Sequence, residues 1–401
     1  MSLREIKPGN RGYLYVNSHP TGCARVVDRM WQRIPEPAGD RPGPVALVIG
    51  SSAGYGLAAT LVGLRAHRMR GLGIAFEADA TERRTASAGW YRTARTAELA
   101  AGAGADFTFL NGDAFSEALK DEVIERLAAR FGAIDLLVYS VAAPRRTDPR
   151  TGEVHRSALK PLGEDYRAKT LVFEGGLPQV GEMHLTAADE AERDATVQVM
   201  GGADWQLWID ALQARGLLAD GFQTVALSYV GSDITAPVYR AGTIGAAKEH
   251  LEATARAIDT RLKGAGRAHT VVAGAAVTQA SSAIPSIALY TSILRRVTGE
   301  GWQSTVDQAA VLWDQFAGDA QPVLDDQGRI RLDGWEMDPA VQADVRAVWD
   351  RIDTDTLATG ADTGWLRDQV GRLYGWDVPG VDYEAAAETH VPWPAADPGP
   401  V

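Results

Sequence analysis

The stretch that decides the fold is Val45-Ala-Leu-Val-Ile49, followed by Gly50-Ser-Ser-Ala-Gly54-Tyr-Gly56. The apolar run predicts a buried strand, and the glycines let the backbone turn sharply into a helix expected over 57–70. A strand, a glycine-rich turn and a helix in this order are typical of the first unit of a dinucleotide-binding fold. The free amides and the dipole at the helix start would then bind phosphate. A glycine-rich turn without a ligand is the alternative.

Short apolar strands and longer helical segments alternate on the carboxyl side of this unit. Strands are expected at 72–76, 106–110, 135–140, 224–229 and 270–277, and helices at 86–103, 116–131, 204–215 and 244–262. This alternation predicts an α/β fold with a Rossmann-type doubly wound parallel sheet and helices on both faces. Right-handed crossovers bring the carboxyl ends of the strands to one edge, where ligands bind. Residues 144–202 break the alternation with turns and charges, and predict an excursion over that edge.

The bulk composition excludes several classes of protein. A formal net charge of -12 and the absence of a long Lys/Arg run argue against a nucleic-acid partner. The single cysteine, Cys23, cannot form an internal disulfide. No apolar run approaches the roughly 18 residues that span a bilayer, and the polar start is no signal peptide. We expect a soluble, cytoplasmic protein without membrane insertion, and we predict no metal site.

Residues at the strand ends supply the rest of a predicted cofactor site. Glu77 ends the second strand, where a carboxylate can accept hydrogen bonds from ribose hydroxyls and repel a 2′-phosphate. This predicts NADH rather than NADPH. A solvated glutamate is the alternative, and Arg83 and Arg84 lie close enough in sequence to serve a phosphate. Contacts to adenine and to the nicotinamide ribose are expected after the third and fourth strands, at Asp113-Ala114 and Val141-Ala142.

Tyr229, Tyr239 and Lys248 form a candidate catalytic group. Eight residues separate Tyr239 from Lys248, so on one helix the two side chains would point about 180° apart. We expect Thr243 to cap the helix, which leaves Tyr239 on the preceding loop. A phenol aimed at a thioester oxygen would stabilise an enolate and supply a proton. A nearby ammonium would hold the nicotinamide ribose. An ordinary aromatic residue and a solvated lysine are the alternative.

Further stretches follow one another in the order found in one enzyme family. They are Gly50-Ser-Ser-Ala-Gly-Tyr-Gly-Leu57, Ala88-Gly-Trp-Tyr91, Asn111-Gly-Asp-Ala-Phe115, Val199-Met-Gly-Gly-Ala-Asp-Trp205 and the Tyr-x8-Lys unit. With them the chain resembles the FabV-type enoyl-ACP reductase / trans-2-enoyl-CoA reductase family. The resemblance implies NADH-dependent reduction of a trans-2-enoyl thioester carried on acyl carrier protein or coenzyme A, by an enzyme that is usually a monomer.

The resemblance also implies an organisation and a set of site residues. It implies one large domain over 1–401, with an N-terminal strand/turn extension (1–44), an NADH-binding core (45–143), an inserted substrate lid (144–203), the rest of the core with the catalytic segment (204–285) and a helical C-terminal extension (286–401). Tyr239 would be the catalytic acid, Tyr229 a substrate contact and Lys248 a cofactor contact. The residues expected around NADH are Gly50, Ser51, Ser52, Ala53, Gly54, Tyr55, Phe76, Glu77, Asp113, Ala114, Val141, Ala142, Ala276, Val277 and Thr278.

Three alternatives remain open at this point. One is a coenzyme A-specific trans-2-enoyl-CoA reductase of a pathway other than fatty-acid synthesis. Another is a carbonyl reductase on the same frame, in which Tyr239 would protonate an alkoxide. The third is a protein that senses NADH without turnover. Residues 239–245 resemble the coenzyme A members of the family and residues 279–282 the carrier-protein members, so the carrier is left open.

Overall fold

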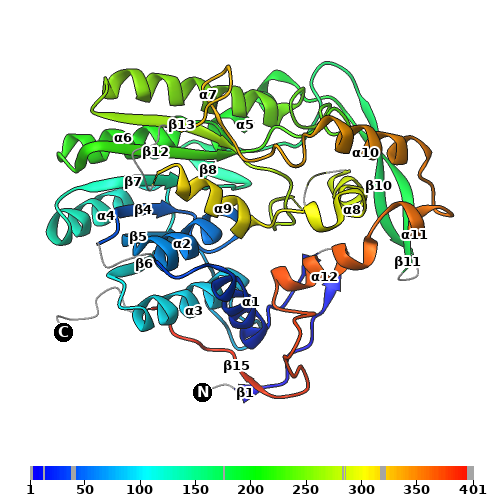
Figure 1. Cartoon of the computed structure of the whole chain (residues 1–401), viewed down its shortest axis with the longest axis horizontal. Helices are drawn as coiled ribbons and strands as arrows, with labels where there is room; N and C mark the ends of the chain where they lie inside the picture. The colour runs from blue at the N-terminus through cyan, green and yellow to red at the C-terminus, as the bar shows by residue number, and fades with distance from the viewer. Residues whose placement is uncertain are drawn as a thin grey trace.

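The computed structural model describes residues 3–11, 14–37, 42–174, 177–281, 284, 286–316 and 322–394. Its centre is a seven-stranded parallel sheet (Figure 1). In sheet order the strands are β14 (Ile330–Arg331), β13 (Gly266–Val272), β12 (Leu218–Ser228), β7 (Ile134–Tyr139), β4 (Val45–Ile49), β5 (Arg70–Ala75) and β6 (Phe107–Asn111). The chain runs outward from β4 to β6, then returns to β7 and runs outward the other way. The predicted doubly wound sheet is therefore confirmed.

Helices cover both faces of the sheet, which is why every residue of β4 is buried. The first face packs against α1 (Pro20–Arg33), α2 (Gly54–His67), α3 (Ala88–Gly102) and α9 (Thr305–Asp314). The second face packs against α4 (Glu117–Arg130), α6 (Ala203–Ala214) and α7 (Thr243–Leu262). Each face buries one large apolar cluster, so the sheet is held rigidly between two hydrophobic layers.

The segment expected to interrupt the alternation forms elements that stand outside the central sheet. They are β8 (Arg145–Thr147), β9 (Val154–Arg156), β10 (Tyr166–Glu174), β11 (Leu177–Leu185) and α5 (Glu190–Met200). The long β10–β11 hairpin lies beside the C-terminal helices α10 (Pro339–Arg351) and α11 (Leu357–Gly360) (Figure 1). Lys169 Nζ of the hairpin donates to the Trp349 carbonyl at 2.7 Å. The division of the chain into five parts stays a prediction, and its boundary at residue 285 lies outside the described residues.

The C-terminal extension is mostly helical. It comprises α8 (Ile287–Thr298), the 3-10 helix η2 (Gly299–Gly301), α9, α10 (Pro339–Arg351), α11 (Leu357–Gly360) and α12 (Thr363–Leu373). It also supplies the edge strand β14, which the sequence did not predict. Near the chain ends, β1 (Leu3–Arg4) pairs with β15 (Ala387–Glu388), and β2 (Asn10–Arg11) pairs with β3 (Leu14–Tyr15).

Two local predictions need correction. The strand expected over 270–277 ends at Val272: the Ala273 amide still donates to the Ser228 carbonyl of β12 at 2.9 Å, but the two amides after it bind side chains instead of a strand. The Gly274 amide donates to Gln308 Oε1 at 2.8 Å, and the Ala275 amide donates to a buried carboxylate at 2.5 Å. Gly242, not Thr243, is the N-cap of α7. The Thr243 hydroxyl instead donates to the carbonyl of Ala158.

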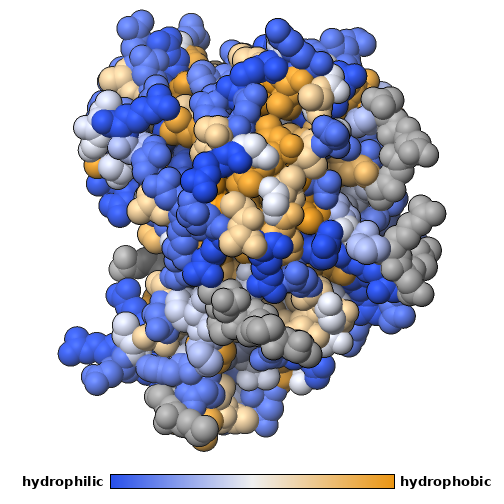
Figure 2. Space-filling view, turned by 90° about the vertical axis from the view of Figure 1, so that its left-hand side faces the viewer, coloured by the Kyte–Doolittle hydropathy of each residue, from blue (hydrophilic) through white to orange (hydrophobic). Residues whose placement is uncertain are grey.

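The surface is mixed in character. Figure 2 shows the left-hand side of Figure 1, where polar and charged side chains dominate and apolar ones gather near the middle. Within the described ranges, no helix is both long and apolar enough to cross a lipid bilayer.

Candidate active site

The loop between β4 and α2 lies where the strand order reverses. Gly50 has a φ of +87°, and a Cβ there would lie 2.0 Å from the Ser140 carbonyl oxygen at the end of β7. Only glycine fits such a turn and approach. Ala53 is the N-cap of α2 and makes no side-chain cap bond, so the amides of the first turn stay available to a ligand. These features fit the predicted phosphate loop of Gly50, Ser51, Ser52, Ala53 and Gly54.

Glu77 follows β5 and is held by two serine hydroxyls. Ser52 Oγ of the phosphate loop donates to Oε1 at 2.6 Å, and Ser87 Oγ at the start of α3 donates to Oε2 at 2.5 Å. The carboxylate is thus fixed between the loop and α3, with lone pairs left for further donors. Phe76 beside it is 73% exposed, and Arg83 and Arg84 are also exposed.

A buried ion pair between Lys120 and Asp204 holds the loop after β6 in place. Lys120 Nζ donates to the Ala114 carbonyl at 2.7 Å and to Asp204 Oδ1 at 2.8 Å. Tyr139 at the end of β7 donates to the other Asp204 oxygen at 3.0 Å. Burial raises the pKa of Asp204, and Lys120 opposes this effect. The network ties the turn at Asp113 and Ala114 to the centre of the sheet, as a rigid adenine-side contact requires.

Eight of the predicted site residues line one cavity of about 150 Å³ at this edge of the sheet. Those that line it are Tyr55, Val141, Ala142, Tyr229, Tyr239, Lys248, Ala276 and Thr278. The phosphate loop is next to it, since a Cβ on Gly54 would lie 3.5 Å from Thr278 Cγ2. Val277 does not line this cavity but borders a second one of about 20 Å³. A larger cavity of about 770 Å³ is lined by none of the predicted residues.

Tyr239 and Tyr229 meet edge to face in this cavity, with ring centroids 4.9 Å apart and planes at 70°. Tyr239 lies in the turn before α7 and is 6% exposed. Its hydroxyl has no hydrogen-bond partner within the described residues. Burial, and secondarily the charge of Glu336, raise the pKa of Tyr239, so it keeps its proton at neutral pH. The geometry leaves this hydroxyl free to donate to a ligand in the cavity.

Lys248 projects into the same cavity from the second turn of α7. Its ammonium has no acceptor in the part of the chain that the structure describes. Burial lowers the pKa of Lys248 to about 8, and the charge of Glu252 acts in the opposite direction. An unpaired, partly buried ammonium beside a free phenol suits the predicted pairing of cofactor contact and acid. Both roles stay predictions.

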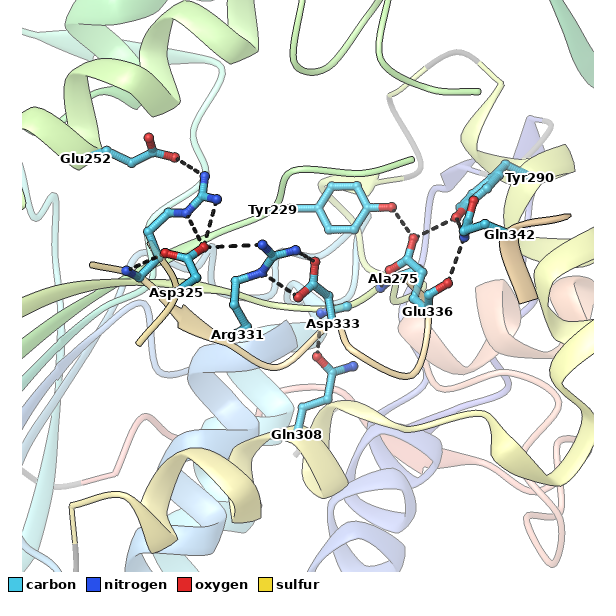
Figure 3. Close-up of polar contacts among 12 residues, drawn as sticks. Tyr229, Glu252, Ala275, Tyr290, Gln308, Asp325, Arg331, Asp333, Glu336 and Gln342 are labelled. Carbon is cyan, nitrogen blue, oxygen red and sulfur yellow. Dashed lines mark hydrogen bonds and ion pairs between the residues drawn. The ribbon is translucent and has the colours of Figure 1, made fainter. Parts of the chain in front are cut away.

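Glu336 belongs to the site but was not predicted from the sequence. It lies in the loop between β14 and α10 and is fully buried. The Tyr229 hydroxyl donates to its Oε1 at 2.7 Å, and in Figure 3 the Tyr229 side chain points directly at it. An isolated glutamate within Asp333-Gly-Trp-Glu-Met-Asp338 shows no periodic or spacing signal that sequence analysis could use.

Comparison with known proteins gives matches along nearly the whole chain. The family model "Trans-2-enoyl-CoA reductase catalytic region" matches residues 84–316, and "NAD(P)H binding domain of trans-2-enoyl-CoA reductase" matches residues 5–82. "Enoyl-[acyl-carrier-protein] reductase [NADH]" of Streptomyces avermitilis is 52% identical over 394 residues, covering 97% of this chain and 100% of that protein. A protein of the same name from Opitutus terrae is 42% identical, covering 96% and 99%.

Two solved structures share the whole architecture. Trans-2-enoyl-CoA reductase of Clostridium acetobutulicum in complex with NADH aligns with a TM-score of 0.92 and 32% identity, covering 98% of this chain and 100% of that one. The Treponema denticola trans-2-enoyl-CoA reductase in complex with NAD aligns with a TM-score of 0.90 and 36% identity, covering 95% and 98%.

A third family model, "Enoyl reductase FAD binding domain", matches residues 324–386. The buried apolar side chains of α10 and α12 in this segment pack into a hydrophobic cluster. Leu366 and Val370 border the cavity of about 20 Å³, which is much smaller than the cavity of about 150 Å³ at the edge of the sheet and has no room for a flavin ring. The described residues of this segment therefore do not fit a flavin, and no step below involves one.

Proposed function

Because the chain belongs to the trans-2-enoyl-CoA reductase family, it is an NADH-dependent enoyl-thioester reductase, and we propose a division of roles among the residues of its cavity. The observation that carries the proposal is that two polar groups without a partner among the described residues line one cavity. The Tyr239 hydroxyl and the Lys248 ammonium both face it, at the carboxyl edge of the sheet.

The cofactor is proposed to lie along this edge. The amides at the start of α2 bind the pyrophosphate, since they are free and at the positive end of the helix dipole. Glu77 accepts hydrogen bonds from the adenosine ribose, and Lys248 donates to the nicotinamide ribose. When bound, NADH supplies the hydride that adds to the β-carbon of the enoyl group.

Tyr239 is proposed as the acid. Negative charge develops on the thioester oxygen when the double bond is reduced, and a protonated phenol in a desolvated cavity stabilises that charge strongly. The raised pKa of Tyr239 keeps the proton in place until it is needed. Tyr229 is proposed as a second substrate contact. Its hydroxyl hydrogen is donated to Glu336, so it is not available to the substrate in this arrangement.

We favour acyl carrier protein as the carrier, with a role in fatty-acid synthesis. The support is the 52% identity to a relative named enoyl-[acyl-carrier-protein] reductase, against 32% and 36% for the structures named for coenzyme A. A cytoplasmic location and a monomeric state stay predictions from the sequence.

Steady-state assays with NADH test these proposals. Crotonyl thioesters of acyl carrier protein and of coenzyme A are compared at matched concentrations, and loss of NADH absorbance is followed. We expect turnover with both and a higher kcat/KM for the carrier-protein thioester. A higher value for coenzyme A would reverse the choice of carrier. Reduction of an acetoacetyl thioester alone would indicate a carbonyl reductase, and NADH binding without any turnover would indicate a sensor.

Cofactor selectivity gives a prediction for Glu77. The wild-type enzyme is expected to have a kcat/KM for NADH at least about tenfold above that for NADPH, equivalent to about 1.4 kcal/mol. Glu77→Ala should relax this preference more than it lowers the melting temperature. Ser87→Ala is the matched control, because it removes one donor to Glu77 and keeps the charge. It should alter the preference less than Glu77→Ala does. Equal use of both cofactors by the wild type contradicts the role of Glu77.

A further inference from the structure

Glu336 lies behind Tyr229, and all partners of its carboxylate among the described residues are hydrogen-bond donors. Oε1 accepts from the Tyr229 hydroxyl at 2.7 Å and from the Tyr290 hydroxyl at 2.8 Å, and Oε2 accepts from the Ala275 amide at 2.5 Å (Figure 3). Among the described residues, no lysine, arginine or histidine forms an ion pair with it. The carboxylate is therefore buried with neutral donors alone, which is an unusual and costly arrangement for an ionised group.

The protonation state of Glu336 decides where the Tyr229 hydrogen points. When Glu336 is ionised, Tyr229 donates its only hydroxyl hydrogen to the carboxylate, away from the cavity. When Glu336 is protonated, the new hydrogen is favoured on Oε1, because the described partner of Oε2, the Ala275 amide, donates and cannot accept. From Oε1 it is donated to one of the two tyrosine oxygens.

Tyr229 is the better acceptor of the two. The oxygen of Tyr290 already accepts from Gln342 Nε2 at 3.1 Å, and Tyr290 is fully buried and lines no part of the cavity. The Tyr229 ring, in contrast, borders the cavity beside Tyr239. Once Tyr229 accepts from Glu336, its own hydrogen is free to turn into the cavity.

We propose that Glu336 is a positioning residue that acts through Tyr229: the protonated carboxyl group makes Tyr229 a hydrogen-bond donor to the substrate, and the ionised group withdraws that donor. The inference rests on the proposed function, since it assigns the second donor of the same reaction. Tyr239 stays the proposed acid, and Tyr229 adds a contact to the thioester oxygen. Glu336 gives no proton to the substrate during turnover, because its protonated form only sets the direction of the Tyr229 hydrogen bond.

The electrostatic surroundings make both states accessible near neutral pH. Burial raises the pKa of Glu336 to about 7, while the two tyrosine hydroxyls and the Ala275 amide lower it and the charge of Asp333 raises it. Asp333 is itself paired with Arg331 at 2.6 Å.

The titratable groups that face Glu336 are Tyr55 from α2, Tyr229 after β12, Tyr239 before α7, Tyr290 from α8 and Asp333 from its own loop. Burial raises the pKa of each of these tyrosines, so Glu336 is the member that titrates.

The test is the pH profile of kcat at saturating NADH and crotonyl thioester. Below a pH of about 7 Glu336 is protonated and Tyr229 donates to substrate; above it the donor is withdrawn. Wild-type kcat is therefore expected to fall with rising pH, by up to about tenfold per unit, toward the value of Tyr229→Phe. Glu336→Gln should remove this fall. Its amide oxygen accepts from the Ala275 amide and its amide nitrogen donates to Tyr229, as the protonated acid does.

Two further variants test the same role of Glu336 in other ways. Tyr290→Phe removes a donor to the same oxygen without touching the cavity, so the ionised form is less stabilised and the fall should move to higher pH. This shift remains diagnostic even where Glu336→Gln fails to fold. In a Tyr229→Phe background, Glu336→Gln should change kcat no further. Melting temperatures of all variants are measured alongside to separate loss of fold from loss of rate.

Three outcomes overturn the role of Glu336. They are a wild-type kcat that does not change with pH, a fall that persists in Glu336→Gln, and an effect of Glu336→Gln that survives in the Tyr229→Phe background. A wild-type enzyme that reduces no enoyl thioester at any pH overturns the proposed function itself, which is a different result from any of these.

Discussion

A Tyr239→Phe variant is expected to lose a factor of about 10²–10³ in kcat while its affinity for NADH stays close to wild type. The substitution removes one donor aimed at the developing enolate and keeps the aromatic ring. The edge-to-face contact with Tyr229, at 4.9 Å between centroids, is retained. Because the Tyr239 hydroxyl has no partner within the described residues, its loss leaves no buried group unsatisfied. The melting temperature should therefore hardly change. Steady-state kinetics, NADH titration and thermal unfolding measure the three quantities.

Tyr229→Phe is the matched control for this variant. It should lower kcat less, since Tyr229 supplies a supporting contact, but it should cost more stability because Glu336 loses a donor. Near-wild-type kcat in Tyr239→Phe together with an inactive Tyr229→Phe would reverse the two roles. Full activity in both variants would mean that this segment is not catalytic and that only the cofactor site stands.

Lys248→Ala is expected to weaken NADH binding by about 10–100-fold and to lower turnover as well. A hydrogen bond from a charged group contributes about 1.5–3 kcal/mol, and this ammonium has no competing acceptor in the described part of the chain. The pKa of about 8 gives the same contact a pH dependence. Below that pH the group is charged and binds; above it the charge is lost, so the Kd of NADH for the free wild-type enzyme should rise. Fluorescence titration at several pH values measures both effects.

Glu249→Ala is the control for Lys248→Ala, because Glu249 is the next residue of α7 and is exposed. It should leave the Kd and its pH dependence unchanged. Unaltered turnover and NADH affinity in Lys248→Ala would show that Lys248 is only a solvated helix residue.

The central sheet could be predicted because each of its longer strands is an apolar run bounded by turn residues. Strand β4 and helix α2 lie within a few residues of their expected positions, since burial on both faces leaves a continuous signal. Strand β14 has only two residues, too few for any pattern. The end of β13 was misplaced because the residues after it are as apolar as a strand, although their amides bind Gln308 and Glu336.

Some residues of the candidate site could also be placed from the sequence, and others could not. The positions of Glu77, Tyr239 and Lys248 at this edge of the sheet could be predicted because each stands close in sequence to a recognisable strand end or helix start, and their roles stay predictions. Glu336 could not, because its partners Tyr290, Ala275 and Tyr229 lie 46, 61 and 107 residues away in the sequence. Its role depends on a burial that only the assembled fold produces.

The contacts of residues 389–393 with α3 and β6 also bear on how the protein is made. Trp90 Nε1 and the Tyr91 hydroxyl in α3 donate to the carbonyls of Val391 and Thr389, which follow them by 301 and 298 residues. Trp393 Nε1 donates to the Phe109 carbonyl, 284 residues earlier. Contacts of such high sequence separation raise the contact order and slow folding. A ribosome adds about 5–20 residues per second, so the half of the sheet around α3 emerges long before its partners exist. The nucleotide-binding half must therefore remain incomplete until residues 389–393 have been synthesised and have packed against it.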